Sequence, residues 1–469
     1  MSSDERIRYS PPWGNASIIG VAGSSGSGKT SLALAIVASL NLPWVVIMSM
    51  DSFYKPLTPE QSAAAFRNEF DFDSPEAIDF DILVDRLRDI KNGKVAEVPV
   101  YSFEKHARLE QTTIVYSPHV LILEGIFALH DQRVLDMLDL RIFAEADSDL
   151  CLSRRSQACT SFSPYPVPSS SFEPTLIRAV VRDVKERGRD IEGCIKQWFS
   201  FVKPNFYKYV SPQREIADII IPRGIENRVA IQMISSQITS TLATKSAQHQ
   251  LELTRLGKIA EDSPLSKNAI VLKQTNQVRG IHALLMDPAT NREDCIFYFD
   301  RLAGLLVETA VDFMQFTSVS VTTPQNYTYT GLHPVGEVSA VVILRGGSAF
   351  ETGLRRTIPD CRTGRMLIQT NYRTGEPELH YRALPTNIAE HGLILVLDPQ
   401  MSSGAAALMA VKVLVDHGVP ERKIVFVTYL AGRVGVNRVL RVFPEVRCVI
   451  ARMGDDMESR WVETRYLGC

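Results

Sequence analysis

Short apolar runs alternate with helical patterns through the first half of the chain. Such runs, separated by helices, are typical of buried parallel strands in an α/β sheet. An Ala/Leu-rich helix is expected over residues 29–40, directly after the first run. The pattern therefore predicts an α/β domain over residues 16–240, preceded by an N-terminal tail over residues 1–15. The runs expected as strands are ASIIGVAG, WVVIMSM, HVLILEGIF, LRIFAE and ADIIIP.

A second α/β pattern occupies residues 269–469. Its expected strands are VSAVVILRGG, RMLIQTN, GLILVLDP and KIVFVTYL. The intervening residues 241–268 are polar and contain no core-forming run, so we expect an interdomain connection, partly helical. The two halves do not resemble each other, which excludes an internal repeat. The sequence thus predicts two different α/β domains.

One stretch interrupts the first pattern. Residues 157–175, QACTSFSPYPVPSSSFEPT, are rich in Ser and Pro and lie between two helical, Arg-bearing segments. This composition cannot build a core and favours an exposed insertion. A mistranslated intron would have the same composition, and the sequence leaves both readings open.

The composition is that of an ordinary globular protein. Hydrophobic residues make up 45% and charged residues 22% of the 469 residues, so the chain can bury a sizeable core. The formal net charge of −2 gives no general attraction for nucleic acid or anionic lipid, so any phosphate must be held locally. We therefore expect small-molecule substrates, with neither nucleic acid nor membrane as a partner. A homo-oligomer is also expected.

The cysteines and the N-terminus indicate the compartment. The seven cysteines are odd in number and scattered, with no C-x-x-C pair, which favours a reducing compartment over a disulfide framework or a zinc site. The N-terminal MSSDERIRYSPPWGN has charges and prolines where a secretory signal needs an apolar run, and no stretch reaches the ~18 apolar residues of a membrane span. A cytoplasmic location is expected, and these features do not separate cytosol from nucleus.

A glycine-rich loop carries the strongest chemical signal. The segment GSSGSGKT satisfies G-x-x-x-x-G-K-[ST] directly between an expected strand and an expected helix, which is the context that this motif requires. Backbone N–H groups of the small residues and the helix N-terminus surround nucleotide phosphates, Lys29 neutralises β- and γ-oxygens, and the Thr30 hydroxyl binds Mg²⁺. The expected phosphate-binding residues are Gly23, Ser24, Ser25, Gly26, Ser27, Gly28, Lys29 and Thr30.

Two carboxylates follow expected strands. Asp51 comes after WVVIMSM, where it could take a proton from a substrate hydroxyl, and Glu124 ends the apolar part of HVLILE, where it could hold Mg²⁺. Each alone could equally be a helix cap or a solvated loop acid. Their combination with a complete phosphate loop favours catalysis.

An arginine cluster could contact transferring phosphates. Arg182, Arg187 and Arg189 lie in the segment RDVKERGRD, and a mobile Arg-rich lid is one way to supply guanidinium groups while excluding water. The alternative is a solvated helix face with i,i+4 pairs.

These residues resemble the uridine–cytidine kinase family. Members of this family are P-loop kinases that use ATP and Mg²⁺ to phosphorylate the 5′-hydroxyl of pyrimidine nucleosides. The resemblance implies that the products are UMP and CMP, in pyrimidine salvage. The resemblance covers nearly the whole first half through GSSGSGKTS, DSFY, FDFDSPEAIDFD, VPVYSFEKHAR, LILEGIFAL, VKERGRDIEGCIKQW, FVKPNFYKYV and ADIIIPRGIENRVAI. It implies that Asp51 is the catalytic base, that Thr30, Glu124 and Asp51 serve Mg²⁺, and that Asp73 binds the ribose 2′- and 3′-hydroxyls.

The resemblance also implies a nucleoside pocket. Tyr101 and His106 would recognise the pyrimidine ring, although a lone histidine in a loop is often merely a polar surface residue. The family's second pocket arginine corresponds to Arg155 or Arg178, and the spacing in RAVVRD favours Arg178. Arg182 and Arg187 match phosphate-contacting lid residues. The implied nucleoside-binding residues are Tyr54, Phe72, Asp73, Tyr101, Phe103, His106, Arg178, Arg189 and Gln197.

The second half resembles uracil phosphoribosyltransferases, through VRGIHALLMD, FYFDRLAGLLVE, VVILRGG, LIQTNYRTGEPELHY and VLDPQMSSGAAA. In the last of these, a strand runs into a loop of small residues that could grip a 5-phosphate. The fold class expected for the whole chain is therefore α/β, a P-loop kinase with a parallel sheet followed by a phosphoribosyltransferase-like domain. A tight turn without a ligand remains the alternative for the loop. The residues of this possible phosphoribosyl-phosphate site are Asp398, Ser402, Ser403 and Gly404, together with Arg345, which matches an arginine near the family's pyrophosphate site.

The C-terminus departs from the transferase pattern. Active members end in a Pro-Gly-Leu-Gly-Asp type turn and a Gly-Asp-Arg segment, whereas this chain ends in WVETRYLGC with Glu463 for glycine and Thr464 for aspartate. A side chain where the backbone must approach the base would obstruct uracil, and loss of the acid removes a donor or metal contact. We expect a degenerate domain.

Three functions are compatible with the sequence. The leading one is a uridine/cytidine kinase with a degenerate second domain. The alternatives are a bifunctional enzyme that makes UMP from both uridine and uracil, and a nucleotide-binding regulator without catalysis. Lys29, Thr30, Asp51 and Glu124 are intact, which argues against the regulator, and no N-K-x-D motif supports a GTPase switch.

Overall fold

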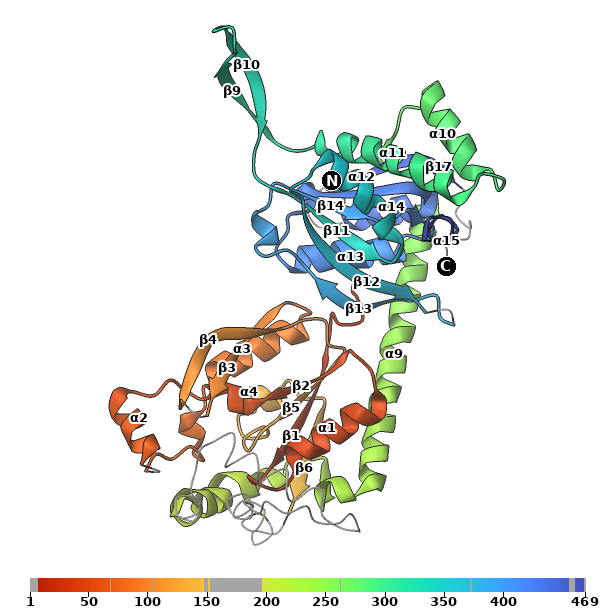
Figure 1. Cartoon of the computed structure of the whole chain (residues 1–469). Helices are drawn as coiled ribbons and strands as arrows, with labels where there is room; N and C mark the ends of the chain where they lie inside the picture. The colour runs from red at the N-terminus through yellow and green to blue at the C-terminus, as the bar shows by residue number, and fades with distance from the viewer. Residues whose placement is uncertain are drawn as a thin grey trace, which may run out of the picture. The chain divides into compact units, whose positions relative to one another are not determined.

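The computed structural model describes residues 7–67, 69–103, 105–146, 151, 196–261, 263–371, 373–454 and 460–467. They belong to two compact units (Figure 1). One unit spans Pro12–Lys245, and the other combines Ser246–Cys469 with the N-terminal residues up to Pro11. The expected insertion at residues 157–175 lies outside the described residues. Within the described part of the chain, no helix is long and apolar enough to cross a membrane.

A five-stranded parallel sheet organises the first unit, in the order β2-β5-β1-β6-β7. Each strand falls within an apolar run that the pattern predicts as a strand, so this part of the expected fold is confirmed. The strands are β1 (Ser17–Gly23), β2 (Val45–Ser49), β5 (Val120–Glu124), β6 (Leu140–Glu145) and β7 (Ile219–Pro222).

Helices cover both faces of this sheet. Successive residues along a strand point to opposite faces, so each strand contributes side chains to two cores. Ile18 of β1 packs in one core with Leu83 of α3, whereas Ile19 packs in another with Leu32 of α1 and Ile234 of α9. The strands are therefore buried on both faces and apolar throughout. Among the described residues, the helices of this unit are α1 (Lys29–Leu40), α2 (Pro59–Phe66), α3 (Phe80–Lys91), α4 (Gln132–Leu135), α8 (Lys203–Asn205) and the first part of α9 (Arg228–Glu261), which continues into the second unit after Lys245.

A separate antiparallel hairpin accompanies the sheet. It consists of β3 (Ala96–Ser102) and β4 (Ala107–Val115). The apolar runs did not predict this hairpin, because β4 is largely exposed and reads ARLEQTTIV. It nevertheless carries side chains of the candidate site.

The second unit is built on an eight-stranded sheet in the order β13-β12-β11-β14-β16-β17-β8, with β15 paired to β16. All pairs are parallel except β12 with β13. The four expected strands are β11, β12, β14 and β16, and the other four were not expected. The strands are β8 (Ala269–Val271), β11 (Val338–Leu344), β12 (Arg362–Thr370), β13 (Pro377–Ala383), β14 (Leu393–Leu397), β15 (Gln400–Met401), β16 (Ile424–Gly432) and β17 (Arg447–Gly454).

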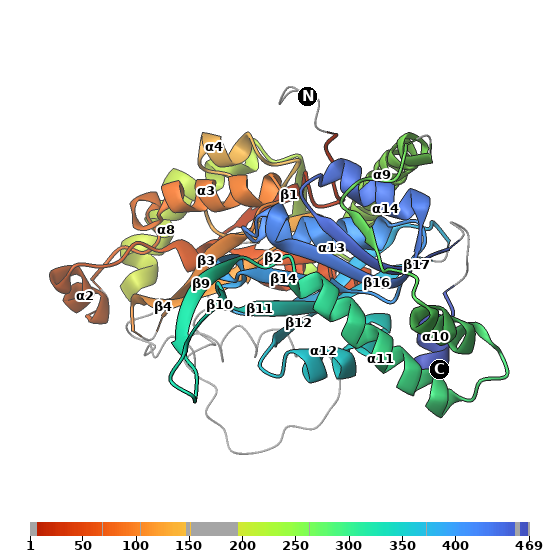
Figure 2. The ribbon, with the colours of Figure 1, turned by 90° about the horizontal axis from the view of Figure 1, so that it is seen from above.

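Helices also lie on both sides of the second sheet. Figure 2 shows α11 on one side and α13 with α14 on the other. Leu302 and Leu306 of α11 join β-strand residues in the main core of this unit. The helices are α10 (Asn276–Met286), α11 (Arg292–Val311), α12 (Glu351–Thr357), α13 (Ala405–Asp416), α14 (Arg433–Val442) and α15 (Val462–Leu467). The expected fold class, two α/β parts of different topology, is confirmed.

The polar stretch expected as a connection is mostly helix, because α9 continues to Glu261. Leu253, Leu256 and Ala260 are buried at helical spacing. Beyond the helix end, the buried Asn437 of α14 donates hydrogen bonds to the carbonyl oxygens of Ala260 (3.3 Å) and Ser263 (2.9 Å). Side chains of α14 thus satisfy carbonyl groups at the C-terminus of α9.

Part of the expected N-terminal tail is packed. Tyr9 is buried, and its hydroxyl lies 2.8 Å from Nε2 of His249 in α9. Trp13 is also buried, with its ring 5.8 Å from that of Tyr116. Two aromatic side chains of this polar segment are therefore packed, Tyr9 within the second unit and Trp13 within the first.

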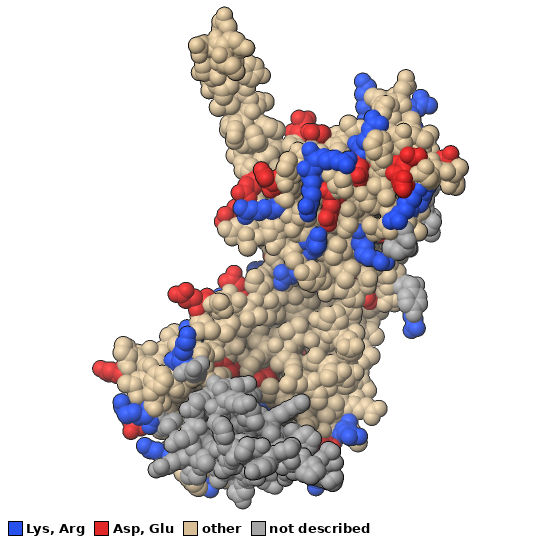
Figure 3. Space-filling model, viewed as in Figure 1, with Lys and Arg blue, Asp and Glu red and all other residues tan. Residues whose placement is uncertain are grey.

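A two-stranded arm projects from the second unit. It consists of β9 (Phe316–Thr322) and β10 (Thr328–Pro334), which pair with each other. Residues 316–335 contain no Lys, Arg, Asp or Glu, and Figure 3 shows the arm without charged side chains. Tyr327 and Leu332 are 74% and 70% exposed, so the arm presents apolar side chains to its surroundings.

Candidate active site

Three neighbouring strands of the first sheet end at the glycine-rich loop. Strand β5 lies between β2 and β1, and in its register Glu124 faces Ser49 on one side and Val21 on the other. The loop follows β1, and Asp51 follows β2 by two residues. The carboxyl ends of parallel strands are where α/β folds build ligand sites, so the topology brings the two carboxylates and the loop to one edge.

The loop runs directly into helix α1, whose first residue is Lys29. Gly28 forms the N-cap with φ of 89°, a left-handed conformation that a side chain would strain. Ser27 is fully buried, and its hydroxyl has no hydrogen-bond partner among the described residues. The result is a turn of small residues whose N–H groups precede a helix, which is the arrangement that cradles phosphates.

Thr30 and Glu124 meet inside this edge. The Thr30 hydroxyl donates a hydrogen bond to Oε2 of Glu124 at 3.1 Å, and Glu124 is only 3% exposed. A hydroxyl next to a buried carboxylate is a suitable ligand pair for Mg²⁺, which typically takes one or two protein oxygens together with substrate phosphates. The residues therefore fit the ion that the sequence implies.

Asp51 lies in a short helical turn directly after β2, termed η1 (Met50–Phe53). Its backbone N–H donates a hydrogen bond to the Ser49 hydroxyl at 3.4 Å. The turn lies close against the end of β5, because a Cβ built on Gly125 would be 2.6 Å from Cβ of Met50. Glycine at this position thus permits the approach between the strand that bears Glu124 and the turn that bears Asp51.

Aromatic rings form a continuous cluster beside this turn. The Tyr54 ring centroid lies 5.2 Å from that of Tyr101 and 5.6 Å from that of Phe72. The Phe72 and His106 rings stack at 5.3 Å with an interplanar angle of 21°. Phe103 joins through Tyr101 at 5.3 Å. The structure thus brings five sequence-predicted residues together from the position after η1, the hairpin and the segment before α3.

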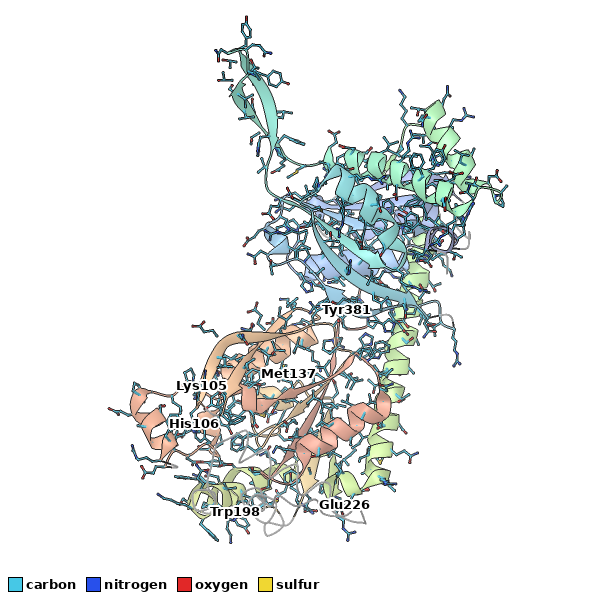
Figure 4. All side chains as sticks on the ribbon, viewed as in Figure 1. Lys105, His106, Met137, Trp198, Glu226 and Tyr381 are labelled. Carbon is cyan, nitrogen blue, oxygen red and sulfur yellow. The ribbon has the colours of Figure 1, made fainter. Side chains whose placement is uncertain are left out.

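His106 is buried, at 8% exposure, in the turn of the β3–β4 hairpin. Figure 4 shows it beside helix α2, and its ring lies 4.9 Å from that of Phe66 at the end of this helix. Its burial argues against the alternative of a merely polar surface histidine.

Arg108 ties the hairpin to the Asp51 turn. From β4 it donates hydrogen bonds to the carbonyl oxygens of Tyr54 (2.8 Å) and Phe53 (3.1 Å), and it pairs with Asp79 at 3.2 Å. The Arg108 and Asp79 side chains are only 16% and 20% exposed. Sequence reasoning missed this residue, although it stands two positions after His106 in the motif itself.

Asp73 is half-buried, and its backbone N–H donates to Oδ1 of Asp71 at 3.0 Å. Sequence reasoning also missed Asp71. Its Oδ1 and Oδ2 accept hydrogen bonds from Nδ2 of Asn205 at 2.9 and 2.7 Å. Burial raises the pKa of Asp71, while the hydrogen bond from Asn205 opposes that shift. Asp71 therefore acts as an anchor for the loop that presents Asp73.

The remaining predicted residues of this unit fall into two groups. Gln197 is described and is 3% exposed, directly before the turn Trp198–Val202. The arginines predicted for the pocket and the lid, Arg178, Arg182, Arg187 and Arg189, lie outside the described residues, as does the alternative Arg155.

In the second unit, the loop predicted to hold a phosphate follows strand β14 and leads into helix α13. Asp398 is 2% exposed, and Gly404 is the N-cap of α13. Ser403 Oγ accepts the N–H of Ala405 at 3.4 Å, and Arg438 donates to the Ser403 carbonyl at 2.6 Å.

Arg345 belongs to the neighbouring loop. It is exposed and directly precedes the turn η7 (Gly346–Phe350) after β11. Because β11 pairs with β14, both loops lie at one edge of the second sheet. Ser402 lies in the same turn as Ser403.

Asp398 is not open to a ligand. It forms an ion pair with Arg460, which sequence reasoning missed. Burial raises the pKa of Asp398, and the guanidinium of Arg460 acts in the opposite direction. The signal in the sequence was weak, because Arg460 lies 62 residues away in a region that departs from the family pattern.

Comparison with known proteins agrees with both halves of this description. Residues 18–158 and 167–230 match the "Phosphoribulokinase / Uridine kinase family", and residues 271–465 match "Uracil phosphoribosyltransferase". The first match covers the sheet edge with Thr30, Asp51 and Glu124, and the second covers the loop at Asp398.

Relatives extend along nearly the whole chain. A uridine kinase of Saccharomyces cerevisiae is 41% identical and aligns with 98% of this chain and 90% of its own length. A uridine kinase of Schizosaccharomyces pombe is 38% identical, covering 98% and 97%. Uridine-cytidine kinase-like 1 of Mus musculus is 42% identical, covering 94% of this chain and 77% of that protein. The chain belongs to the uridine kinase family and is a kinase with a uracil phosphoribosyltransferase-like second domain.

Proposed function

We propose that the first domain transfers the γ-phosphoryl group of ATP to the 5′-hydroxyl of uridine and cytidine, giving UMP and CMP in pyrimidine salvage. The observation that carries this proposal is the contact of Thr30 with Glu124 at the end of β5, next to the Asp51 turn. A nucleotide site, a magnesium ligand pair and a carboxylate at a strand end are the parts that phosphoryl transfer to a hydroxyl requires. Names of relatives supply the nucleoside class.

The chain's own residues have separate roles in this proposal. The N–H groups of residues 23–28 hold the phosphates, and the Lys29 ammonium offsets negative charge on the β- and γ-oxygens. Thr30 and Glu124 would hold Mg²⁺, which when bound would neutralise charge on the transferring group. Asp51 also lies at this edge and completes the proposed metal set.

The nucleophile is the nucleoside's own 5′-hydroxyl. Asp51 accepts its proton as the oxygen attacks the γ-phosphorus and the bond from this phosphorus to the bridging β–γ oxygen breaks, leaving ADP and the nucleoside monophosphate. Asp51 is half-buried and belongs to the turn directly after β2, so the end of a sheet strand anchors the residue that would accept the proton.

The aromatic cluster is proposed to bind the pyrimidine. Stacked and edge-to-face rings give a flat base a large apolar surface, and the His106 ring and the Tyr101 hydroxyl supply polar atoms for its edge. Asp73 would accept hydrogen bonds from the ribose 2′- and 3′-hydroxyls. Gln197 and the arginines Arg178, Arg189, Arg182 and Arg187 complete the nucleoside and phosphate contacts in this proposal.

For the whole chain we propose a kinase domain over residues 16–240 and a degenerate transferase-like domain over residues 269–469. The cytosol is the proposed compartment, supported by the thiols of Cys295, Cys361 and Cys448, which form no disulfide among the described residues. A homo-oligomer remains a prediction, which light scattering on the full chain would measure.

The test is an assay of the purified chain with Mg²⁺ and ATP, with uridine or cytidine supplied separately. We expect UMP and CMP to form by chromatography, and Glu124→Gln to require more Mg²⁺ for half-maximal rate. Glu110→Gln, at an exposed position of β4, is the matched control. Absence of both products with ATP and with GTP would refute the proposal.

A further inference from the structure

The described C-terminal residues, 460–467, are attached to the second unit. Arg465 donates hydrogen bonds to the carbonyl oxygens of Leu285 (2.6 Å), Asp287 (2.9 Å) and Thr290 (2.9 Å), at the end of α10 and the loop after it. In return, Arg292 donates to the carbonyl of Leu467 at 2.7 Å. The segment is therefore fixed at its far end to the body of the domain.

The middle of the segment is anchored in the core. Val462 is 3% exposed, and the Tyr466 hydroxyl donates to Oδ1 of the buried Asp300 at 2.8 Å. The Trp461 ring lies 6.0 Å from the fully buried Tyr429 ring. Helix α15 thus has a defined position and is not a loosely attached end.

The near end of the segment lies on the loop predicted to hold a phosphate. Arg460 pairs with Asp398, and the Trp461 N–H donates to Oε1 of Gln400 at 3.1 Å. Both partners belong to the stretch from β14 to β15 that precedes Ser402 and Ser403. The Arg460 guanidinium therefore pairs with the Asp398 carboxylate, which the hydroxyls of a ligand or a metal ion would otherwise contact.

Glu463 lies at the same edge of the second sheet, beside the loop that carries Arg345. Its Oε2 is 2.6 Å from where a Cβ on Gly346 would stand, directly after Arg345, and the same position is 3.2 Å from Cγ of Pro399. The Glu463 carboxylate also acts electrostatically on both Asp398 and Arg460. A negative group thus lies beside Gly346, the residue after Arg345, at the point where the two loops meet.

We propose that residues 460–467 are an intramolecular ligand of the second domain's phosphoribosyl site, with Arg460 covering Asp398 and the Glu463 carboxylate standing where the donor's pyrophosphate would lie. A phosphorylated ribose must displace this segment before it can bind. The apparent affinity for such a ligand is reduced by the small fraction of molecules in which the segment is displaced. This inference rests on the proposed phosphate loop and is independent of the kinase assignment.

Calorimetric titration of the full chain with phosphoribosyl pyrophosphate and Mg²⁺, with inorganic pyrophosphate in a second series, tests the proposal. The double variant Arg460→Ala/Glu463→Gly removes both contacts and leaves Trp461, Val462 and Tyr466 in place. Thr464→Ala, at an exposed position of the same helix, is the matched control. Kinase activity and thermal unfolding of each sample monitor the fold.

We expect the double variant to bind at least ~10-fold more tightly than the parent, within the range of ordinary coupling between competing ligands, while Thr464→Ala binds like the parent. Where the double variant fails to fold, Glu463→Gln removes the charge at constant size, and the same criterion applies to its affinity for pyrophosphate. Equal affinity of the parent and a folded variant overturns the inference, whether all bind or none does. Kinase activity unchanged in that case would leave the proposed function intact.

Discussion

At the residue scale, the candidate active site depends on side chains that are distant in sequence and share one sheet edge. Thr30 and Glu124 are 94 residues apart, yet their oxygens are 3.1 Å apart because β1 and β5 are neighbours. Glu124 is buried, and a buried carboxylate is costly unless it is paired or binds a metal. One hydroxyl is a modest partner for it, which is consistent with a role in holding Mg²⁺.

The first prediction concerns Asp51. Asp51→Asn should bind nucleotide like the parent but turn over ~10²- to 10⁴-fold more slowly, the usual range for loss of a general base, because the amide cannot accept the proton. Turnover with uridine and calorimetric ATP binding measure the two effects. Asp85→Asn, whose side chain is 63% exposed on α3, should behave like the parent. Near-parental turnover in a folded Asp51→Asn would remove Asp51 from this role.

The second prediction concerns Asp73. Asp73→Ala should mainly weaken nucleoside binding, by about 1 to 3 kcal/mol, because ribose hydroxyls would lose their acceptor in a partly buried site. Uridine KM and kcat, measured with ATP saturating, separate binding from turnover. The parental enzyme should also prefer uridine to 2′-deoxyuridine. Equal use of the two nucleosides would contradict the proposed contact of Asp73 with the ribose hydroxyls.

At the scale of elements, a turn and a hairpin are held together by one side chain. The turn η1 carries Asp51 and leads to Tyr54, and the hairpin carries Tyr101 and His106. Arg108 spans them with hydrogen bonds to the carbonyl groups of Phe53, the last residue of the turn, and Tyr54, the residue after it. Its charge is balanced by Asp79, so the arginine can remain partly buried. The geometry makes Arg108 a positioning residue.

The third prediction tests this positioning. Arg108→Met should lower kcat by about 10- to 100-fold, because a displacement of ~1 Å at the reacting groups has an effect of this size, with a smaller change in nucleotide binding. Arg108→Lys should recover part of the loss, since lysine can reach one carbonyl group. Arg88→Met, whose parent side chain is 60% exposed, is the control. A folded Arg108→Met with parental kcat would contradict the role, and thermal unfolding excludes simple loss of stability.

At the scale of the whole molecule, two different α/β units share one chain, and helix α9 belongs to both. The first unit has the groups for phosphoryl transfer at one sheet edge. The second unit retains the loop at Asp398 but carries its own C-terminal segment against it. The chemistry that we propose for the chain therefore lies in the first unit.

The fourth prediction follows for the second unit, which should show no measurable uracil phosphoribosyltransferase activity. A site that holds phosphate but cannot position the base loses the lowering of the activation barrier that comes from holding the two reactants together, worth up to roughly 7 to 11 kcal/mol. The assay combines the full chain with uracil, phosphoribosyl pyrophosphate and Mg²⁺, with and without GTP, and detects UMP by chromatography. The kinase reaction of the same sample serves as the positive control. UMP formation at enzymatic rates would establish the bifunctional alternative instead.

The sequence by itself determined what depends on local pattern. Buried parallel strands are continuous apolar runs, so β1, β2, β5, β6, β7 and four strands of the second sheet could be located in advance. The glycine-rich loop was recognisable because its chemistry uses consecutive residues. In contrast, β4 is exposed and β8 is short, so neither leaves a clear apolar signal.

Only the tertiary structure decided which distant groups meet. The sequence identified Thr30 and Glu124 separately, but strand order set their distance. Arg108, Asp71 and Arg460 were missed because their partners are backbone carbonyl groups, an amide and an acid far along the chain, and no local spacing encodes such contacts. The C-terminal residues read as a degenerate motif, whereas the fold places Arg460 and Glu463 against Asp398 and Gly346. The physical reason is that local periodicity reports burial of an element's face, while a site depends on the packing of elements against one another.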